Sequence, residues 1–130
     1  MGIAPDVSKA YSAPAKLNLN EWGLAGNWLV GEENATLLRA PGTIVFRFQA
    51  RDLHLVLGPA ANHKDIRFRV MLDGAAPATS HGVDVDANGN GVVREHRLYQ
   101  LIRQTGGVGQ HTFTIEFSDP DVQAFAFTFG

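Results

Sequence analysis

Residues 84 to 95 carry the densest run of oxygen-bearing side chains in the chain, and their types and spacing could bind a metal ion. The segment fits the calcium-loop pattern D-x-[DN]-x-[DN]-G-x5-E at every specified position. Calcium prefers about six to eight oxygen ligands from carboxylates, amides and carbonyls, and Gly89 would allow the sharp turn of such a loop. The segment therefore predicts a calcium site with the ligands Asp84, Asp86, Asn88, Asn90 and Glu95.

The residues around this loop favour a different interpretation. A calcium loop of the EF-hand type lies between two helices, and Pro77 together with Ser80-His81-Gly82 argues against the first helix. Asp, Asn and Gly are also the residues of tight β-connections, because they tolerate a positive φ. Calcium loops occur outside EF-hands as well, so the sequence leaves a metal site and a structural turn both open.

No other pattern in the chain indicates catalytic or redox chemistry. The sequence has no cysteine, which excludes disulfides, thiol catalysis and thiolate zinc sites. Ser12, Ser80 and Ser118 stand in no nucleophile motif, and a net charge of −2 without a basic run is unlike a nucleic-acid-binding protein. No apolar run approaches the roughly 18 residues of a membrane span. We therefore expect a non-enzymatic protein that neither binds nucleic acid nor inserts directly into a membrane.

Apolar and polar residues alternate along much of the chain, which is the pattern of β-strands with one buried face. The clearest segments are residues 42–50, 52–58, 65–73, 111–118 and 122–130. Shorter strands are expected at residues 22–24, 28–30 and 35–38, and residues 97–104 fit a strand better than a helical turn. In the last segment, Phe125, Phe127 and Phe129 alternate with smaller residues and are expected to share one face.

The order and spacing of these strands predict a β-sandwich. Breaker pairs such as Asp73-Gly74, Gly106-Gly107 and Asp119-Pro120 separate the strands. One buried face per strand suits an antiparallel sheet, and many short strands at close spacing suit two packed layers. Residues 1–16 are polar and contain two prolines, so we expect a flexible arm or linker there and the β-sandwich domain over residues 17–130.

Six blocks of the sequence carry a resemblance to a known family. They are NEWGLAGNW at residues 20–28, FQARDLHLVLGP at 48–59, FRVMLDG at 68–74, HGVDVD at 81–86, RLYQLIRQ at 97–104 and AFAFTFG at 124–130. Over residues 18–130 the chain resembles the C-terminal domain of bacterial DipZ-type and related thioredoxin-like proteins. The resemblance implies an all-β jelly-roll sandwich similar to a carbohydrate-binding module, which follows a thioredoxin-fold domain in the parent protein.

A carbohydrate-binding module uses flat aromatic rings for sugar stacking and nearby polar groups for the hydroxyls. The candidate ligand-binding residues are Trp22, Trp28 and Tyr99 for stacking, and Arg47, His54, Arg67 and Arg69 on outward strand positions. The alternative is that the tryptophans fill the core, as buried aromatic residues usually do, and that the arginines are solvated.

The resemblance implies a function outside the cytoplasm, as an accessory domain of a redox protein. We expect a non-catalytic accessory module of a thioredoxin-like protein that binds a glycan, with the thioredoxin-fold domain of the parent chain as a partner. The alternative is a protein-interaction or packing domain that positions the thioredoxin-fold domain without binding sugar. The start Met1-Gly2-Ile3-Ala4-Pro5 lacks the charged and apolar regions of a signal peptide, so a localisation in the periplasm or cell envelope rests on the resemblance, and we expect this piece to belong to a longer chain.

Overall fold

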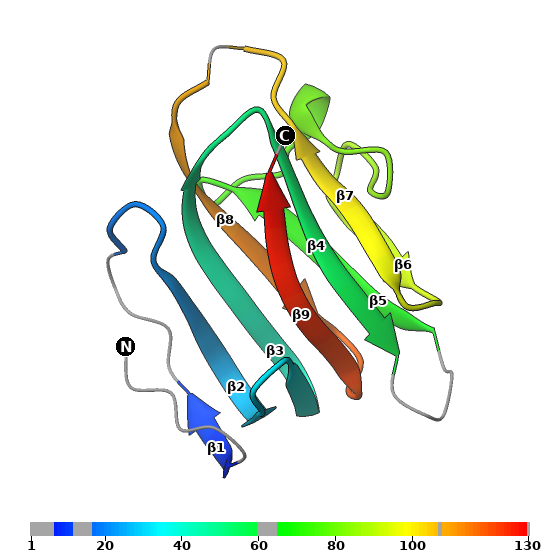
Figure 1. Ribbon diagram of the computed structural model, residues 1–130. Coiled ribbons are helices and arrows are strands. Elements are labelled where there is room, and N and C mark those ends of the chain that lie inside the picture. The colour runs from blue at the N-terminus through cyan, green and yellow to red at the C-terminus, as the bar shows by residue number, and fades with distance from the viewer. Residues whose placement is uncertain (1–6, 12–16, 60–64, 107, 130) are drawn as a thin grey trace.

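The computed structural model describes residues 7–11, 17–59, 65–106 and 108–129. Within these residues, nine strands form one continuous antiparallel sheet that curls into a sandwich (Figure 1). The strands are β1 (Val7–Tyr11), β2 (Trp22–Val30), β3 (Ala35–Gln49), β4 (Asp52–Pro59), β5 (Ile66–Leu72), β6 (Asn90–Val93), β7 (Arg97–Arg103), β8 (Gln110–Phe117) and β9 (Val122–Phe129), and a short 3-10 turn, η1, covers Ala78–Ser80. The predicted all-β jelly-roll sandwich is confirmed.

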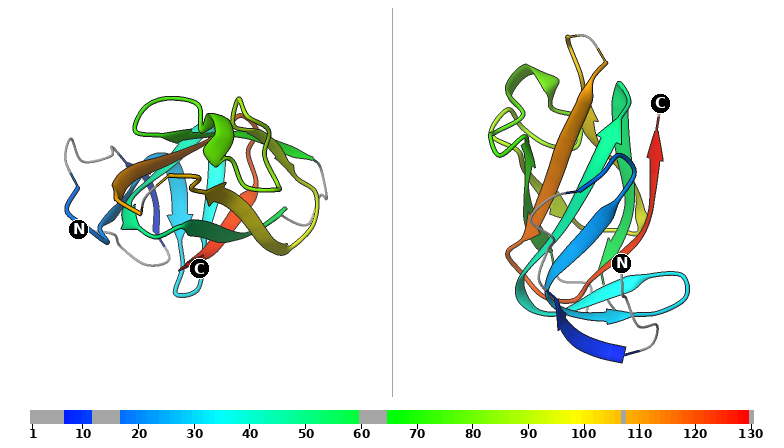
Figure 2. Two further views of the ribbon diagram at one scale, coloured as in Figure 1. Left: turned by 90° about the horizontal axis from the view of Figure 1, so that it is seen from above. Right: turned by 90° about the vertical axis from the view of Figure 1, so that its left-hand side faces the viewer.

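Two layers face each other, and β3 belongs to both. The hydrogen-bonded order is β6-β5-β8-β3-β9-β4-β7, with β2 beside β3 and β1 beside β2. Residues 42–49 of β3 pair with β8, whereas Ala35 and Thr36 at its start pair with β9. Strands β4, β7 and β9 therefore form one layer and β5 and β8 the other, as the views from above and from the side show (Figure 2).

The core lies between the layers and follows the alternation that the sequence predicted. Fully buried side chains include Phe48 of β3, Leu57 of β4 and Phe113 of β8. Aromatic rings join the layers, since Phe46 stacks on Phe127 with centroids 4.5 Å apart and Phe113 meets the same ring edge-on at 6.1 Å. Each fully buried side chain of this size contributes about 1.5–3 kcal/mol through its removal from water, so this contact area holds the layers together.

Two pairs of predicted short strands are single longer strands. Residues 22–24 and 28–30 both belong to β2, and the segments predicted at 35–38 and 42–50 are joined in β3, which ends at Gln49. In β2 the pairing shifts register between Ala25 and Asn27, where Gly26 has a φ of +106°. A side chain there would lie 2.9 Å from the Pro41 carbonyl oxygen, so this irregularity requires glycine. The glycine redirects the strand without ending it.

Strand β9 departs from the predicted alternation near its middle. Leu55 of β4 pairs with Phe127, but Leu57 pairs with Ala124, so β9 has one residue more than β4 between these pairs. Opposite residues on paired strands point to the same face, which turns both Ala124 and Phe127 toward the interior. The expectation that Phe125, Phe127 and Phe129 share one face is therefore wrong at Phe125, because of this bulge.

The predicted N-terminal arm contains a strand. Val7–Tyr11 forms β1, which pairs with residues 26–30 of β2. For these five residues the expectation of a flexible arm differs from the structure, because the edge of β2 offers their backbone hydrogen-bonding partners. The other residues of the segment 1–16 lie outside the described residues, and the domain boundary at residue 17 stays a prediction. None of the described residues forms a helix long and apolar enough to cross a membrane.

Candidate functional site

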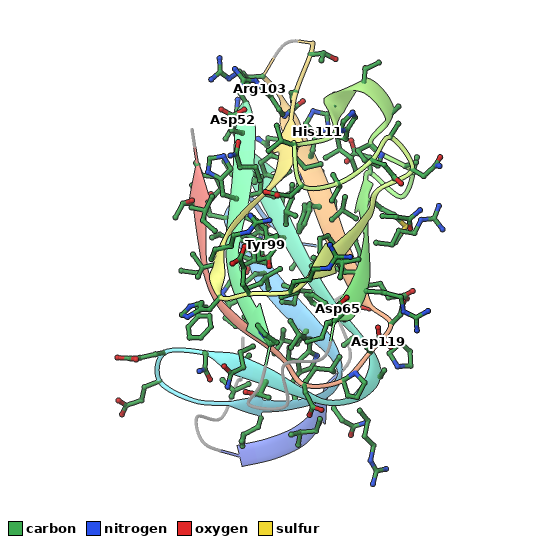
Figure 3. The ribbon with its side chains drawn as sticks, turned by 90° about the vertical axis from the view of Figure 1, so that its right-hand side faces the viewer. Asp52, Asp65, Tyr99, Arg103, His111 and Asp119 are labelled. Carbon is green, nitrogen blue, oxygen red and sulfur yellow. The ribbon has the colours of Figure 1, made fainter. Side chains whose placement is uncertain are left out.

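A pocket of about 310 Å³ opens between the β2–β3 hairpin and β9. Its lining residues come from both layers and from the hairpin turn: Trp22, Leu24, Ile44, Leu55, residues 30–35 and residues 124–127. The hairpin extends away from the sandwich below β9 and is seen in cyan in Figure 2 (right) and Figure 3. This volume is near the lower end of the range of about 300–1,000 Å³ for small-molecule sites, so the pocket suits one small ring or a short side chain.

Aromatic side chains from two strands border the pocket. Trp22 is the first residue of β2 and pairs with Phe46, so its ring points toward the same interior side as Phe46. Because it stands at the strand end, 38% of Trp22 remains exposed to solvent. Phe125 is half-buried on β9, and its ring stacks on His96 with centroids 4.6 Å apart. The pocket therefore has an accessible indole ring and a second, supported ring in its wall.

The rim of the pocket is acidic. The turn between β2 and β3 is closed by a hydrogen bond of 2.8 Å from the Gly31 N–H to the Asn34 carbonyl oxygen. Glu32 and Glu33 occupy the centre of this turn and are exposed. In the part of the chain that the structure describes, neither carboxylate takes part in an ion pair, and the described residues that line the pocket include no Lys, Arg or His.

Two of the three predicted stacking rings lie in the core. Trp28 is 0% exposed, its Nε1 donates to the Ala25 carbonyl oxygen at 2.9 Å, and its ring meets Phe117 edge-on at 6.1 Å. Tyr99 is 1% exposed and lies inside the sandwich, as Figure 3 shows. The prediction of ligand contact is therefore corrected for Trp28 and Tyr99, because the layers cover both rings. Trp22 alone of the predicted ligand-binding residues lines the pocket.

Arg47 and His54 lie on the outer faces of the two layers, away from the pocket lining. The Arg47 side chain donates from Nη1 to the Thr112 hydroxyl at 3.0 Å, across the β3–β8 pair. His54 contacts the Thr128 hydroxyl through Nδ1 at 3.3 Å, across the β4–β9 pair. Both side chains connect neighbouring strands, and the structure does not bring either of them to Trp22.

Arg67 and Arg69 stand on the outward side of β5. Arg67 binds Asp119 in a two-pronged ion pair, with Nε to Oδ2 at 3.0 Å and Nη2 to Oδ1 at 2.9 Å. These side-chain hydrogen bonds, together with one from the Arg67 backbone N–H, lower the pKa of Asp119 to about 2. Arg69 is exposed opposite Glu116 of β8 in the strand register. Neither arginine lines the pocket.

The predicted calcium loop is occupied at its two ends by an arginine of the protein. The Arg97 guanidinium lies 2.7 Å from Asp84 Oδ1 and 3.3 Å from Glu95 Oε1, so it contacts the first and the last predicted ligand. Its central carbon is also 3.9 Å from the centroid of the Tyr99 ring. Burial raises the pKa of Asp84, but hydrogen bonds from Arg97 and from the Gln100 N–H outweigh burial and leave it below its usual value.

The middle of the same loop is a tight turn. Asp86 Oδ1 accepts hydrogen bonds from the backbone N–H groups of Asn88 and Asn90, each at 2.9 Å, and Gly89 between them has a φ of +90°. Asn90 then begins β6, which the sequence did not predict. Among the described residues no group of three or more His, Asp or Glu side chains is placed to hold a metal. The turn accounts for the motif, and the calcium site stays a prediction.

Sequence reasoning missed Phe125, Glu32 and Glu33 as residues of a site. The four residues 31–34 lie between two predicted strands, but nothing local placed them beside β9. The pairing of β3 with β9 joins residues almost 90 positions apart, as in Ala35 with Ala124. A pocket formed by such a long-range pairing leaves no periodic signal in the sequence.

Comparisons with known proteins agree with this fold. A family model described as "Thioredoxin like C-terminal domain" matches residues 1–130. None of the curated proteins matches the chain. A solved structure of a family two carbohydrate esterase from Clostridium thermocellum, in complex with cellohexaose, is similar with a TM-score of 0.61 and 14% sequence identity. The match covers 83% of this chain but only 31% of the esterase chain, and at this identity the likeness concerns the fold alone.

Proposed function

Since the chain belongs to the family of thioredoxin-like C-terminal domains, we propose that it is a non-catalytic accessory module that binds a glycan in the pocket beside Trp22. The observation that carries the proposal is the partly exposed indole ring of Trp22 at the mouth of an apolar pocket, in a molecule whose other tryptophan is fully buried. An exposed large aromatic ring costs hydrophobic free energy in water, which a ligand that covers it would recover.

The pocket has the chemical groups that sugar recognition requires. Sugar rings have apolar C–H faces, and Trp22 and Phe125 offer aromatic surface for them. Sugar hydroxyls need hydrogen-bonding partners, and the carboxylates of Glu32 and Glu33 and the amide of Asn34 supply acceptors and donors at the rim. A mostly apolar pocket with a few polar groups at one side is the usual form of a small-molecule site.

In the parent protein the module would act by proximity. A bound glycan would hold an attached thioredoxin-fold domain near a cell-envelope surface, and tethering of this kind raises effective concentration without new chemistry. The proposed setting is a DipZ-type or related thioredoxin-like protein outside the cytoplasm. This role needs neither a catalytic residue nor a cofactor in the module.

A packing role is the second candidate, and one observation favours it. Phe129 at the end of β9 is half exposed although its backbone partner Leu53 is fully buried. Its ring stacks on Phe46, the strand partner of Trp22, and this exposed apolar side chain could be covered by the thioredoxin-fold domain of the parent chain. In that case the module would orient the redox domain, and Trp22 would contact protein.

Intrinsic tryptophan fluorescence against a panel of soluble glycans separates these two functions. We expect a saturable change in the emission of the wild-type protein, because Trp22 is at the pocket and Trp28 is a constant buried background. Calorimetry should then show that Trp22→Ala and Phe125→Ala each weaken binding by about tenfold or more, as at an interface hot spot.

The matched control is Leu98→Ala on β7, which removes an apolar side chain that is 39% exposed but does not line the pocket. This variant should bind like the wild type. A flat fluorescence response across the whole panel would contradict glycan binding and favour the packing role.

A further inference from the structure

We propose that the pocket selects glycans with a free amino group, of the glucosamine type, over neutral and acidic glycans; this inference rests on the proposed function. The observation behind it is the charge of the rim. Glu32 and Glu33 are adjacent, exposed and central in the hairpin turn, and both line the pocket.

Several acidic residues elsewhere have a cation of the protein beside them, whereas Glu21, Asp86 and Glu116 resemble the turn in having none among the described ion pairs. Asp73, Asp84 and Asp119 each have an arginine or histidine within 4.0 Å, and Asp52 and Asp65 do too. Across the described ranges, by contrast, no cation of the protein balances the two glutamates of the turn. At the mouth of the pocket these carboxylates therefore carry negative charge that no described side chain balances.

An ammonium group on a sugar ring would gain from this arrangement. It would be attracted by the carboxylates of Glu32 and Glu33, and the apolar walls from Leu24 and Ile44 reduce the screening of that attraction by water. A neutral sugar gains no such attraction, and a uronic acid would be repelled.

A lysine side chain of a protein would present the same charge on an apolar stem. The glycan is the better fit because a sugar ring offers a flat C–H face to Trp22 and Phe125 together with hydroxyls for the Asn34 amide. A lysine stem has no hydroxyls, so it would leave that polar group without a partner. A lysine-rich peptide therefore belongs in the experiment as a competing ligand.

Calorimetric titrations at about pH 6 and low salt compare four ligands: a glucosamine hexamer, an N-acetylglucosamine hexamer, cellohexaose and an oligolysine peptide. We expect the glucosamine hexamer to bind most tightly. The double variant Glu32→Gln/Glu33→Gln should weaken its binding by about five- to tenfold, the effect of losing two exposed ion pairs. It should weaken the binding of the two neutral hexamers by a smaller factor, because the glutamine carbonyls still accept hydrogen bonds from sugar hydroxyls.

The control variant is Glu116→Gln, which removes one exposed carboxylate from the outward side of β8, away from the pocket lining. It should leave all four titrations unchanged, and Trp28 emission reports whether each variant keeps its core. Equal affinities for the three hexamers, unaffected by the double variant, would overturn the amine preference and leave the proposed function intact.

Two other results would contradict the proposed function as well as the amine preference. No binding to any hexamer would overturn the proposed function together with the amine preference. Binding of oligolysine alone, lost in the double variant, would overturn both and identify the pocket as a docking site for a basic protein segment.

Discussion

The loop at residues 84–95 and the hairpin turn at residues 31–34 are both acidic, but the fold uses their charges in opposite ways. In the loop, Arg97 binds the carboxylates at both ends, so the charge is neutralised within the protein. In the turn, the two glutamates have no ion-pair partner in the described part of the chain. The loop matches a ligand motif and the turn matches none. Acidic side chains therefore indicate a binding site only where no other group of the folded protein already pairs with them.

The two regions also differ in how their aromatic residues are held. Next to the loop, the Tyr99 hydroxyl donates to the Glu95 carbonyl oxygen at 2.8 Å and accepts from the Arg94 and Glu95 N–H groups at 3.2 and 3.3 Å. At the pocket, Trp22 is partly exposed, and no hydrogen bond of its side chain is found among the described residues. The Tyr99 side chain beside the loop thus contributes to stability, whereas the Trp22 side chain at the pocket remains available for a ligand.

The largest expected effect separates these two aromatic residues by stability. Tyr99→Phe should lower the free energy of unfolding by about 1–3 kcal/mol, because it removes the hydroxyl that satisfies partly buried backbone groups of the β6–β7 turn. Trp22→Phe should cost less than about 0.5 kcal/mol, as surface substitutions usually do. Urea unfolding measures both variants. Equal losses of unfolding free energy in the two variants would contradict the distinction between a closed loop region and an open pocket.

A smaller effect should appear in the pH dependence of stability. The pKa of Asp84 is lowered in the folded protein, so its ion pair stabilises the fold above the unfolded pKa of about 3.9, and this contribution is lost as the pH falls through the folded pKa. Between about pH 7 and pH 2.5, the wild type should therefore lose more unfolding free energy than Asp84→Asn.

The partner of Asp84 provides a check on that result. Arg97→Gln removes the cation that lowers the pKa of Asp84, so it should flatten the same part of the pH profile. Both variants are measured by urea unfolding at each pH. Profiles parallel to that of the wild type would mean that the ion pair at the loop does not stabilise the folded state.

The smallest expected effect is the response to calcium. An ion at the predicted site would have to displace Arg97 from Asp84 and Glu95, so we expect about 1 mM calcium to leave the Tm unchanged. Differential scanning calorimetry with calcium and with a chelator tests this expectation. A rise of several degrees that Asp86→Ala abolishes would support the calcium site and make the two acidic regions more alike than their geometry indicates.

Local patterns in the sequence were sufficient to predict most of the fold. Ile44, Phe46 and Phe48 occupy every second position of residues 44–48, and each of them is buried in β3 as that alternation requires. The same reasoning predicted a strand at residues 97–104, where a helical turn was the alternative, and β7 covers residues 97–103 of it. Alternation depends only on neighbouring residues in the chain, which is why these strands could be predicted without tertiary information.

The candidate site could be predicted only in part, because long-range contacts decide it. Trp22 and Trp28 look equivalent in the sequence, but only Trp22 stands at a strand end that the opposite layer leaves uncovered. The bulge that takes Phe125 out of alternation is a property of the β4–β9 pair. Likewise, the motif at the loop could not reveal that Arg97, two residues beyond it, would bind both of its ends.

The long strand β3 has a consequence for how the domain loses its structure. Because its first residues pair with β9 and its later residues with β8, neither layer can detach without breaking the ladder of the other. Opening of one layer alone is thereby disfavoured, and the sandwich should unfold as a single cooperative unit. The pocket has Ile44 from one layer and Leu55 from the other in its wall. A ligand bound between them would protect the backbone amides of the whole sandwich from hydrogen exchange, including those far from the hairpin.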